Sequence, residues 1–188
     1  LLSLIGSSDK ICPHLHIPLQ SGSDKILKAM NRPYSASFFR EKTEYIKSRI
    51  PDTALTTDVM VGFPGEGEEE FRQTRDLIER INFSRLHVFP FSPHEGTPAA
   101  RMKQRVSQEE ARSRTENLRK LSQELEKYFR AKFKDKTLHP VIEKIEDDHI
   151  KGRTEYYFQV SFDKKHSRIA SQYKNSEELI GKIDTVKL

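Results

Sequence analysis

The feature that most constrains the fold is a repeated order of short apolar run, polar loop and amphipathic helix over residues 1–100. The predicted extended runs are 14–19, 54–62 and 86–91. The predicted helices begin after Ser23, after Pro33 and at Glu68. Strands that alternate with helices in this order form a parallel sheet, as in a β/α barrel or a doubly wound sheet.

Three strands are too few to close a barrel, and the chain starts with Leu1 rather than Met. We therefore expect an α/β fold in which this region is the C-terminal portion of a β/α, partial TIM-type barrel. The earlier strands of that barrel are expected upstream of Leu1.

The second half of the chain changes its pattern twice. A capping box at 107–110 and a stripe of apolar residues through Leu118 and Leu121 predict one long basic helix over 107–135. Beyond it the apolar period becomes two, and the predicted strands are 141–145, 156–162 and 181–186. We therefore predict two domains, the barrel portion at 1–136 and a small all-β domain at 137–188.

Composition excludes several classes of protein. Cys12 is the only cysteine, so the chain cannot form an internal disulfide or hold an iron–sulfur cluster or four-cysteine zinc site by itself. No apolar run approaches the ~20 residues that span a bilayer, so we expect no membrane partner and a cytoplasmic location. Residues 101–136 carry 12 Lys and Arg against 6 Asp and Glu, and this surplus predicts a polyanionic partner.

Polar or glycine-rich loops follow each predicted strand, where β/α folds bind ligands. Gln20, Ser21 and Ser23 offer amide and hydroxyl groups at a helix N-terminus, although taken alone they are more often explained by ordinary capping. Asp58 lies in an apolar strand and needs a partner, for which Arg32 is one candidate. His14 and His16 share a strand face, but a histidine pair without further ligands is more often structural than metal-binding. The sequence holds no catalytic triad, Walker loop or GxGxxG motif.

Several motifs together resemble one enzyme family. They are CPHLHIPLQSGS at 12–23, MNR at 30–32, TDVMVGFPGE at 57–66, FSP at 91–93 and GTPA at 96–99. In this order and spacing they resemble the radical S-adenosylmethionine (SAM) methylthiotransferases, closest to the MiaB/MtaB-like branch that acts on tRNA. The runs GRTEYY at 152–157 and LIGK at 179–182 resemble the TRAM domain, a small OB-like barrel, of these enzymes.

The resemblance implies a reaction, its cofactors and its partner. Such enzymes use S-adenosylmethionine and two [4Fe–4S] clusters to add a methylthio group to C2 of N6-threonylcarbamoyladenosine, next to the anticodon in the tRNA anticodon stem-loop. One cluster is held by a CxxxCxxC motif, which does not occur in these 188 residues. We therefore expect the cluster ligands and catalytic residues to lie outside this chain, no metal ligand within it, and no activity from the chain alone.

The resemblance also implies which residues line the S-adenosylmethionine cavity. These are Gln20, Ser21, Gly22, Ser23, Asp58, Gly62, Glu66, Phe91 and Ser92. For RNA we predict cations of the long helix together with Arg153 and Tyr157, because RNA is gripped by phosphate contacts and aromatic stacking. The helix residues are Arg112, Arg119, Lys120, Lys127 and Arg130. Tyr157 is preferred because alternation along a strand gives it the opposite phase to Tyr156 and Phe158.

Two alternatives stay open at this point. One is the sister enzyme of the same family that methylthiolates an aspartate of a ribosomal protein. The other is a non-catalytic RNA-binding module with a degenerate barrel. A chain that lacks part of its barrel also exposes a sheet edge, so we expect it to dimerise through that edge.

Overall fold

The computed structural model describes residues 1–173 and 175–187, which group into two compact units. The α/β unit comprises residues 15–127 with Leu2, and the β-rich unit comprises residues 128–188 with 3–14 and Leu1. Each unit is described by itself. Within the described residues, no helix combines the length and apolar character that crossing a membrane requires.

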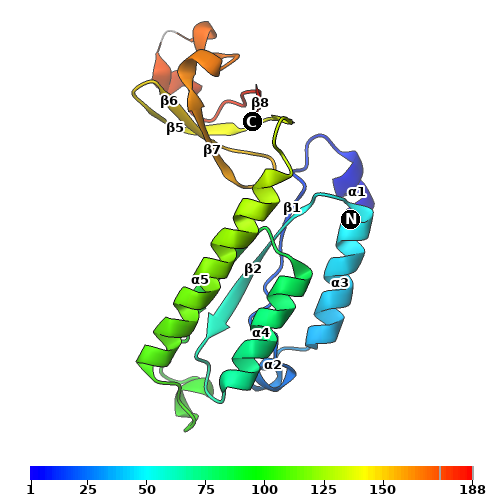
Figure 1. Cartoon of the computed structure of the whole chain (residues 1–188), viewed down its shortest axis with the longest axis vertical. Coiled ribbons are helices and arrows are strands. Elements are labelled where there is room, and N and C mark those ends of the chain that lie inside the picture. The colour runs from blue at the N-terminus through cyan, green and yellow to red at the C-terminus, as the bar shows by residue number, and fades with distance from the viewer. Residues whose placement is uncertain (174, 188) are drawn as a thin grey trace. The chain divides into compact units, whose positions relative to one another are not determined.

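The α/β unit is built around a parallel sheet, which confirms the predicted class (Figure 1). Its strands are β1 (His14–His16), β2 (Ala54–Val61) and β3 (Arg85–Pro90), in the spatial order β1-β2-β3. β2 and β3 pair in parallel from Thr56 opposite Arg85 to Val61 opposite Pro90. The helices of this unit are α2 (Asp24–Ala29), α3 (Ala36–Arg49), α4 (Glu68–Ile81), the short helix Ala99–Arg101 and α5 (Gln108–Ala131) up to Lys127, whereas α1 (Leu2–Ser7) belongs to the β-rich unit except for Leu2.

The two faces of the sheet differ in character. Leu55, Val59 and Val61 of β2 pack in one core with Leu86 and Val88 of β3. The same core includes side chains from α3, α4 and α5, so these three helices cover one face of the sheet. On the other face, Ala54 and Thr56 at the start of β2 are buried, whereas the remaining strand residues are half-buried or exposed: Asp58, Met60, Arg85, His87 and Phe89.

Local sequence signals fix the ends of the helices. The hydroxyl of Ser35 accepts a hydrogen bond from the Phe38 N–H, and α3 ends shortly before Pro51. α4 ends at Asn82, which adopts the left-handed conformation at φ +55°. Ser107 caps α5 by accepting from the Glu110 N–H, as the capping box predicts.

The β-rich unit contains an antiparallel sheet and a separate strand pair. The sheet is β5 (Val141–Glu146), β6 (His149–Arg153) and β7 (Gln159–Asp163), and the pair is β4 (Thr137–Leu138) with β8 (Val186–Lys187). Three short helices complete the unit: Lys164–His166, Ala170–Gln172 and Ser176–Leu179. Its core is formed by Ile142, Ile150 and Leu179, with Ile145 and Phe162 against them.

Two strand predictions for this unit were wrong. The predicted strand 156–162 begins only at Gln159, because residues 155–157 form a turn in which Tyr157 has φ +66°. The predicted strand 181–186 is reduced to β8, although Ile183 makes an isolated bridge to Val141. Strand β6 was missed, because its sequence HIKGR lacks a clear apolar alternation.

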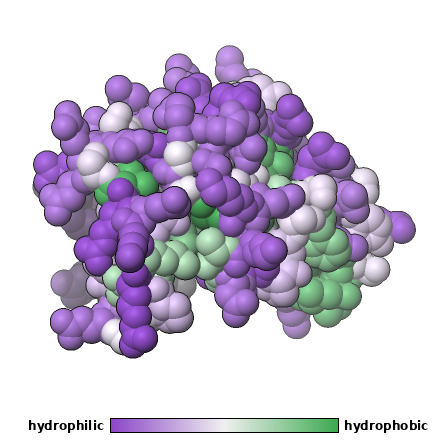
Figure 2. Space-filling view, turned by 90° about the horizontal axis from the view of Figure 1, so that it is seen from below, coloured by the Kyte–Doolittle hydropathy of each residue, from purple (hydrophilic) through white to green (hydrophobic). Residues whose placement is uncertain are grey.

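Figure 2 shows a surface that is largely hydrophilic, with hydrophobic residues in separate areas. This agrees with a chain in which 32% of residues are charged and 35% are hydrophobic.

Candidate functional site

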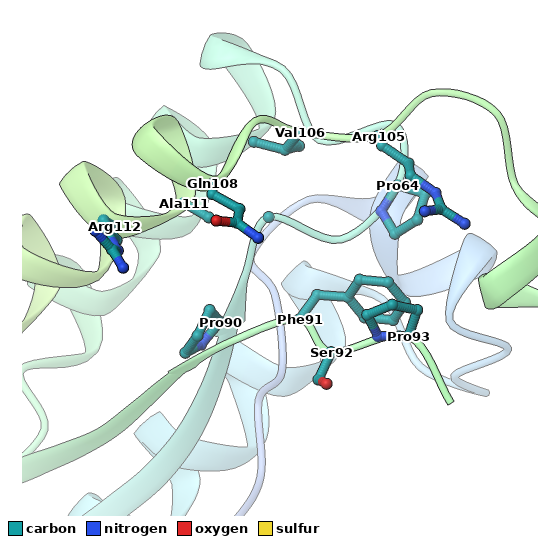
Figure 3. A pocket seen from close by; sticks show the side chains of 11 residues that line it. Pro64, Pro90, Phe91, Ser92, Pro93, Arg105, Val106, Gln108, Ala111 and Arg112 are labelled. Carbon is teal, nitrogen blue, oxygen red and sulfur yellow. The ribbon is translucent and has the colours of Figure 1, made fainter. Parts of the chain in front are cut away.

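A cavity of about 450 Å³ lies where β2 and β3 end, and we call it the strand-end pocket (Figure 3). One side is the segment 90–93 after β3, and the opposite side is the start of α5 with the residues before it. Gly62 and Pro64, from the loop between β2 and α4, complete the wall. The pocket thus occupies the position where parallel α/β sheets bind ligands.

The lining of the strand-end pocket combines apolar walls with a few polar groups. The apolar members are Pro64, Pro90, Phe91, Pro93, Val106 and Ala111. The polar side chains are those of Ser92, Arg105, Gln108 and Arg112, with no carboxylate among the lining residues that the structure describes. Flat apolar surfaces next to hydroxyl, amide and guanidinium groups suit a nucleoside that carries an anionic group.

The loop after β2 is held by a buried ion pair. Glu66 is 4% exposed, and its Oε1 lies 2.8 Å from Nη1 of Arg114 on α5. The same oxygen accepts the Gly62 N–H at 2.8 Å. Burial raises the pKa of Glu66 above its ordinary value, against the opposing effects of the Gly62 and Arg114 hydrogen bonds.

Glu66 therefore does not face the pocket as a free carboxylate, although Gly62 beside it does line the pocket. Arg114, expected with the other cations on the polar faces of the helix, is instead 3% exposed. Sequence reasoning missed it because its partner lies 48 residues away.

The predicted residues Gln20–Ser23 lie inside the protein. Gln20 continues the pairing of β1, since its N–H donates to the Asp58 carbonyl and its own carbonyl accepts from Met60. Ser21 is completely buried, with its hydroxyl 3.2 Å from that of Thr74 on α4. A Cβ on Gly22 would lie 2.5 Å from the Thr74 Cα, so this glycine allows close packing of the loop on α4. None of the four lines the strand-end pocket, and Ser23 precedes α2 without a side-chain capping bond.

Asp58 pairs with His16 and not with Arg32 in the described residues. The carboxylate oxygen lies 3.4 Å from Nε2 of His16, whose Nδ1 is 3.0 Å from the Thr56 hydroxyl. The two groups sit on the polar face of the sheet, where His87 is opposite Asp58 in the strand register and its ring contacts His16. The described residues contain no group of three or more potential metal ligands.

The predicted RNA-binding cations fall in several environments. Arg112 lines the strand-end pocket, and Arg119, Lys120 and Lys127 are exposed along α5. Arg130 lies over the Phe158 ring at 5.5 Å from its centroid.

The excess of positive charge lies beside α5 rather than on it. The helix ends at Ala131, not at 135, and residues 108–131 hold six basic and five acidic residues. Residues 101–107 hold three basic and no acidic residues, and residues 132–136 hold three basic and one acidic. The prediction of a basic helix was therefore wrong in detail, because the flanking segments carry most of the surplus.

Tyr157 is 45% exposed, whereas Phe158 is buried. The Tyr157 ring stacks on His14 with centroids 4.2 Å apart, and the Arg153 guanidinium lies 4.8 Å from the centroid of the Tyr157 ring. Arg153 also forms an ion pair with Glu143 at 2.6 Å. Tyr157 therefore owes its exposure to a turn and not to strand alternation.

The residues fit an adenosyl group better than an iron–sulfur cluster. The single cysteine, Cys12, is exposed, and one thiol cannot supply the ligands of a cubane. The strand-end pocket, in contrast, offers a half-buried aromatic ring at Phe91 and the Ser92 side chain beside it.

Comparison with known proteins agrees with this geometry. Residues 3–78 match the profile of the Radical SAM superfamily. Along its whole length the chain is 39% identical to "Threonylcarbamoyladenosine tRNA methylthiotransferase MtaB" of Bacillus subtilis, of which it covers 40%. The chain therefore resembles the radical SAM methylthiotransferase family. A relative whose name states a different substrate is also similar: "tRNA-2-methylthio-N(6)-dimethylallyladenosine synthase" of Thermoanaerobacter pseudethanolicus is 38% identical over the whole chain, which covers 38% of it.

A further relative is the MtaB protein of Thermotoga maritima. It is 38% identical over 81% of this chain and is covered to 36% of its own length. The chain therefore spans about two fifths of the length of the curated methylthiotransferases that it matches.

Proposed function

We propose that this chain is part of a radical SAM methylthiotransferase that adds a methylthio group to C2 of N6-threonylcarbamoyladenosine in a tRNA anticodon stem-loop. The observation that carries the proposal is the strand-end pocket, one part of which is formed by residues of the motifs at 57–66 and 91–93. Gly62, Phe91 and Ser92 all line it. The threonylcarbamoyl substrate is favoured because the MtaB proteins of two organisms are among the relatives.

We assign the adenosyl group of S-adenosylmethionine to the strand-end pocket. This cofactor supplies the deoxyadenosyl radical and the methyl group in the family's chemistry. Phe91 offers a ring face for the adenine, and Ser92 and Gln108 offer hydrogen-bonding groups. The cluster ligands lie outside this chain, because Cys12 is its only cysteine.

We assign the RNA backbone to the cations near this pocket. Arg105 and Arg112 both line it, and no carboxylate among the described lining residues neutralises them. Arg119, Lys120 and Lys127 extend the basic surface along α5. We also assign to RNA the side chain of Arg130, at the end of α5, and those of Arg153 and Tyr157. We infer that residues 137–188 form a TRAM-like domain, which follows a barrel portion at 1–136.

Binding of S-adenosylhomocysteine, measured by titration calorimetry, tests the adenosyl site on this chain alone. Ser92→Trp places an indole at the exposed edge of the pocket, and we expect it to abolish binding. Ser113→Trp, at an exposed position of α5 that does not line the pocket, is the control and should bind as the wild type does. Failure of the wild type to bind, or undiminished binding by Ser92→Trp, would contradict the proposal.

The substrate is tested with the full-length protein that contains this sequence. After cluster reconstitution, the enzyme is incubated with S-adenosylmethionine and with tRNA that carries either threonylcarbamoyladenosine or dimethylallyladenosine. Mass spectrometry of the nucleosides should show the methylthio product only for the first. Methylthiolation of dimethylallyladenosine alone would support the second candidate, which the Thermoanaerobacter relative favours.

A further inference from the structure

Arg114 is a buried cation on α5 that the proposed chemistry does not use. Its Nη1 donates to Oε1 of Glu66 at 2.8 Å and to the Glu66 carbonyl oxygen at 3.0 Å. Its Nη2 bonds the carboxylate of Glu110, one turn earlier on the helix. The side chains of Arg114 and Glu66 are 3% and 1% exposed. One guanidinium therefore joins the β2–α4 loop to α5 through both the side chain and the backbone of Glu66.

The contact continues from Glu66 to the wall of the strand-end pocket. The oxygen that meets Arg114 also accepts the Gly62 N–H, and Gly62 adopts φ +74°. A Cβ on Gly62 would lie 3.0 Å from the Cβ of Ala111 on α5. Gly62 and Ala111 both line the pocket, so their contact sets the distance between the loop and α5 in its wall. Arg114 holds this contact in place through Glu66.

A second link supports the same arrangement. The Gly65 N–H donates to the Gln104 carbonyl oxygen at 2.8 Å. The segment before α5 and the helix itself are thus both bonded to the loop 62–66. These bonds leave little freedom for the loop to move away from α5.

The chemistry of the Arg114–Glu66 pair favours a role in positioning the loop over a role in stability alone. Burying two charges is costly, and packed apolar residues of similar volume often stabilise a protein as well or better. Two polar atoms, Glu66 Oε2 and Arg114 Nε, make no hydrogen bond within the described residues. What an arginine fork adds over apolar packing is a fixed direction of contact.

We propose that Arg114 is a positioning residue of the strand-end pocket: through Glu66 it holds the loop 62–66 against α5 and fixes the shape in which the pocket receives the adenosyl group. The proposal deepens the proposed function and rests on it for the ligand.

Hydrogen exchange tests the link without any ligand. We compare Arg114→Met, which removes the charge, with Arg114→Lys, which keeps it without the fork. The control is Ile46→Val, which trims a core side chain of α3. Arg114→Met should speed exchange of the Gly62 and Gly65 amides by about tenfold or more relative to the amides of β2. Ile46→Val should leave that ratio unchanged.

Affinity for S-adenosylhomocysteine tests the consequence for the pocket. Arg114→Met should weaken binding by about tenfold or more, and Arg114→Lys should restore part of the loss. The double variant Glu66→Gln/Arg114→Met should bind no more weakly than Arg114→Met, because the two residues act as one unit. Ile46→Val should bind within about twofold of the wild type.

The outcomes separate the two proposals. Faster exchange at Gly62 with unchanged affinity would overturn the positioning role and leave the proposed function standing. Unchanged exchange in a folded Arg114→Met variant would overturn the link itself. A wild type that does not bind would overturn the proposed adenosyl site and the ligand part of this inference with it. If Arg114→Met does not fold, Glu66→Gln is measured in its place with the same expected outcomes, and Arg114→Lys should show the same changes in smaller measure.

Discussion

Gly22 shows how a residue of a family motif can serve packing. A Cβ at this position would lie 2.5 Å from the Thr74 Cα and 2.8 Å from the Gln73 carbonyl oxygen, both of them backbone atoms of α4. The Gly22 N–H also donates to the Thr74 hydroxyl at 2.9 Å. A methyl group here cannot be accommodated by a side-chain rotation alone.

Gly22→Ala should therefore destabilise the chain by about 3 kcal/mol, near the upper end for overpacking. Gly67→Ala is the matched control, because its Cβ would meet only the mobile end of Glu70 and should cost below about 1 kcal/mol. Urea denaturation of both variants measures the difference. Equal losses would show that α4 yields to the extra methyl group.

Residues of the candidate site could be predicted from the sequence only in part. Gly62, Phe91 and Ser92 follow predicted strands, and the rule that ligands bind at strand ends placed them near the pocket that they line. Arg114 was missed although its spacing from Leu118 places it on the apolar stripe of the helix, because an arginine is buried only with a partner and its carboxylate is distant in the sequence. The same holds for Ser21, whose burial depends on Thr74.

At the scale of elements, α5 protects the edge of the sheet. In the described residues β3 pairs with β2 alone, so some β3 amides point away from the sheet. The Leu86 N–H instead donates to the hydroxyl of Ser122 on α5 at 2.9 Å, in a buried position. A helix hydroxyl thus replaces the missing strand neighbour.

Ser122→Ala should cost about 1–3 kcal/mol, because it leaves the Leu86 N–H buried without an acceptor. Ser113→Ala, at an exposed position on the same helix, should change stability by less than about 0.5 kcal/mol. Thermal unfolding followed by circular dichroism distinguishes them. A loss from Ser122→Ala no larger than the control's would mean that the amide finds another acceptor.

The β5–β6 hairpin carries an acid-sensitive ion cluster. Hydrogen bonds from Lys144 and Lys151 lower the pKa of Glu146 from 4.5 to about 2. Because the folded pKa is depressed, the stabilisation is present above pH 4.5 and is lost as the pH falls towards about 2.

A pH titration checks this expectation. The carboxyl resonance of Glu146 should titrate near pH 2, and its midpoint should rise towards 4.5 in concentrated salt, which screens the two lysines. In Glu146→Gln, the fall in stability between these pH values should be shallower than in the wild type. A midpoint near 4.5 at low salt would contradict the structure.

Elements whose apolar residues follow one clear helix or strand spacing were predictable from the sequence, and segments with mixed spacing were not. The helix at Glu68–Ile81 was predicted with its observed bounds, because its apolar spacing, acidic first turn and preceding glycine agree. Residues 155–158 were misread, since consecutive aromatic residues fit a strand. In the structure Tyr156 packs on Phe133, at 4.2 Å between ring centroids, from within a turn. The turn conformation of this segment is therefore associated with aromatic contacts to Phe129 in the last turn of α5 and to Phe133 just after it.

For the whole molecule, the placement of charge determines how RNA affinity should depend on salt. The segment 101–107 has cations without acidic neighbours in the sequence, whereas those of α5 alternate with glutamates. Cations next to carboxylates release fewer counterions when they meet a phosphate. The three basic residues of 101–107 should therefore contribute more than three from the helix.

This difference is measurable with a labelled anticodon stem-loop. Binding is followed by fluorescence anisotropy from about 50 to about 200 mM salt. Replacing Arg101, Lys103 and Arg105 with Gln should lower the salt slope by about 2–3, at about 0.9 for each phosphate contact. Replacing Arg119, Lys120 and Lys127 with Gln should lower it by less than about 1. Equal changes in salt slope for the two triple variants would show that the cations of α5 contact RNA as much as those of 101–107.

The unequal faces of the sheet also limit how this sequence can change length. In β2, Leu55 and Val59 face the helices while Asp58 and Met60 face away. Inserting a single residue inside β2 would move the residues after it to the opposite face of the sheet, so the Asp58 carboxylate would point into the core. Insertions and deletions should therefore be absent from 54–61 in related sequences. They should be common around Gly96, where an added Cβ meets no atom within 4 Å.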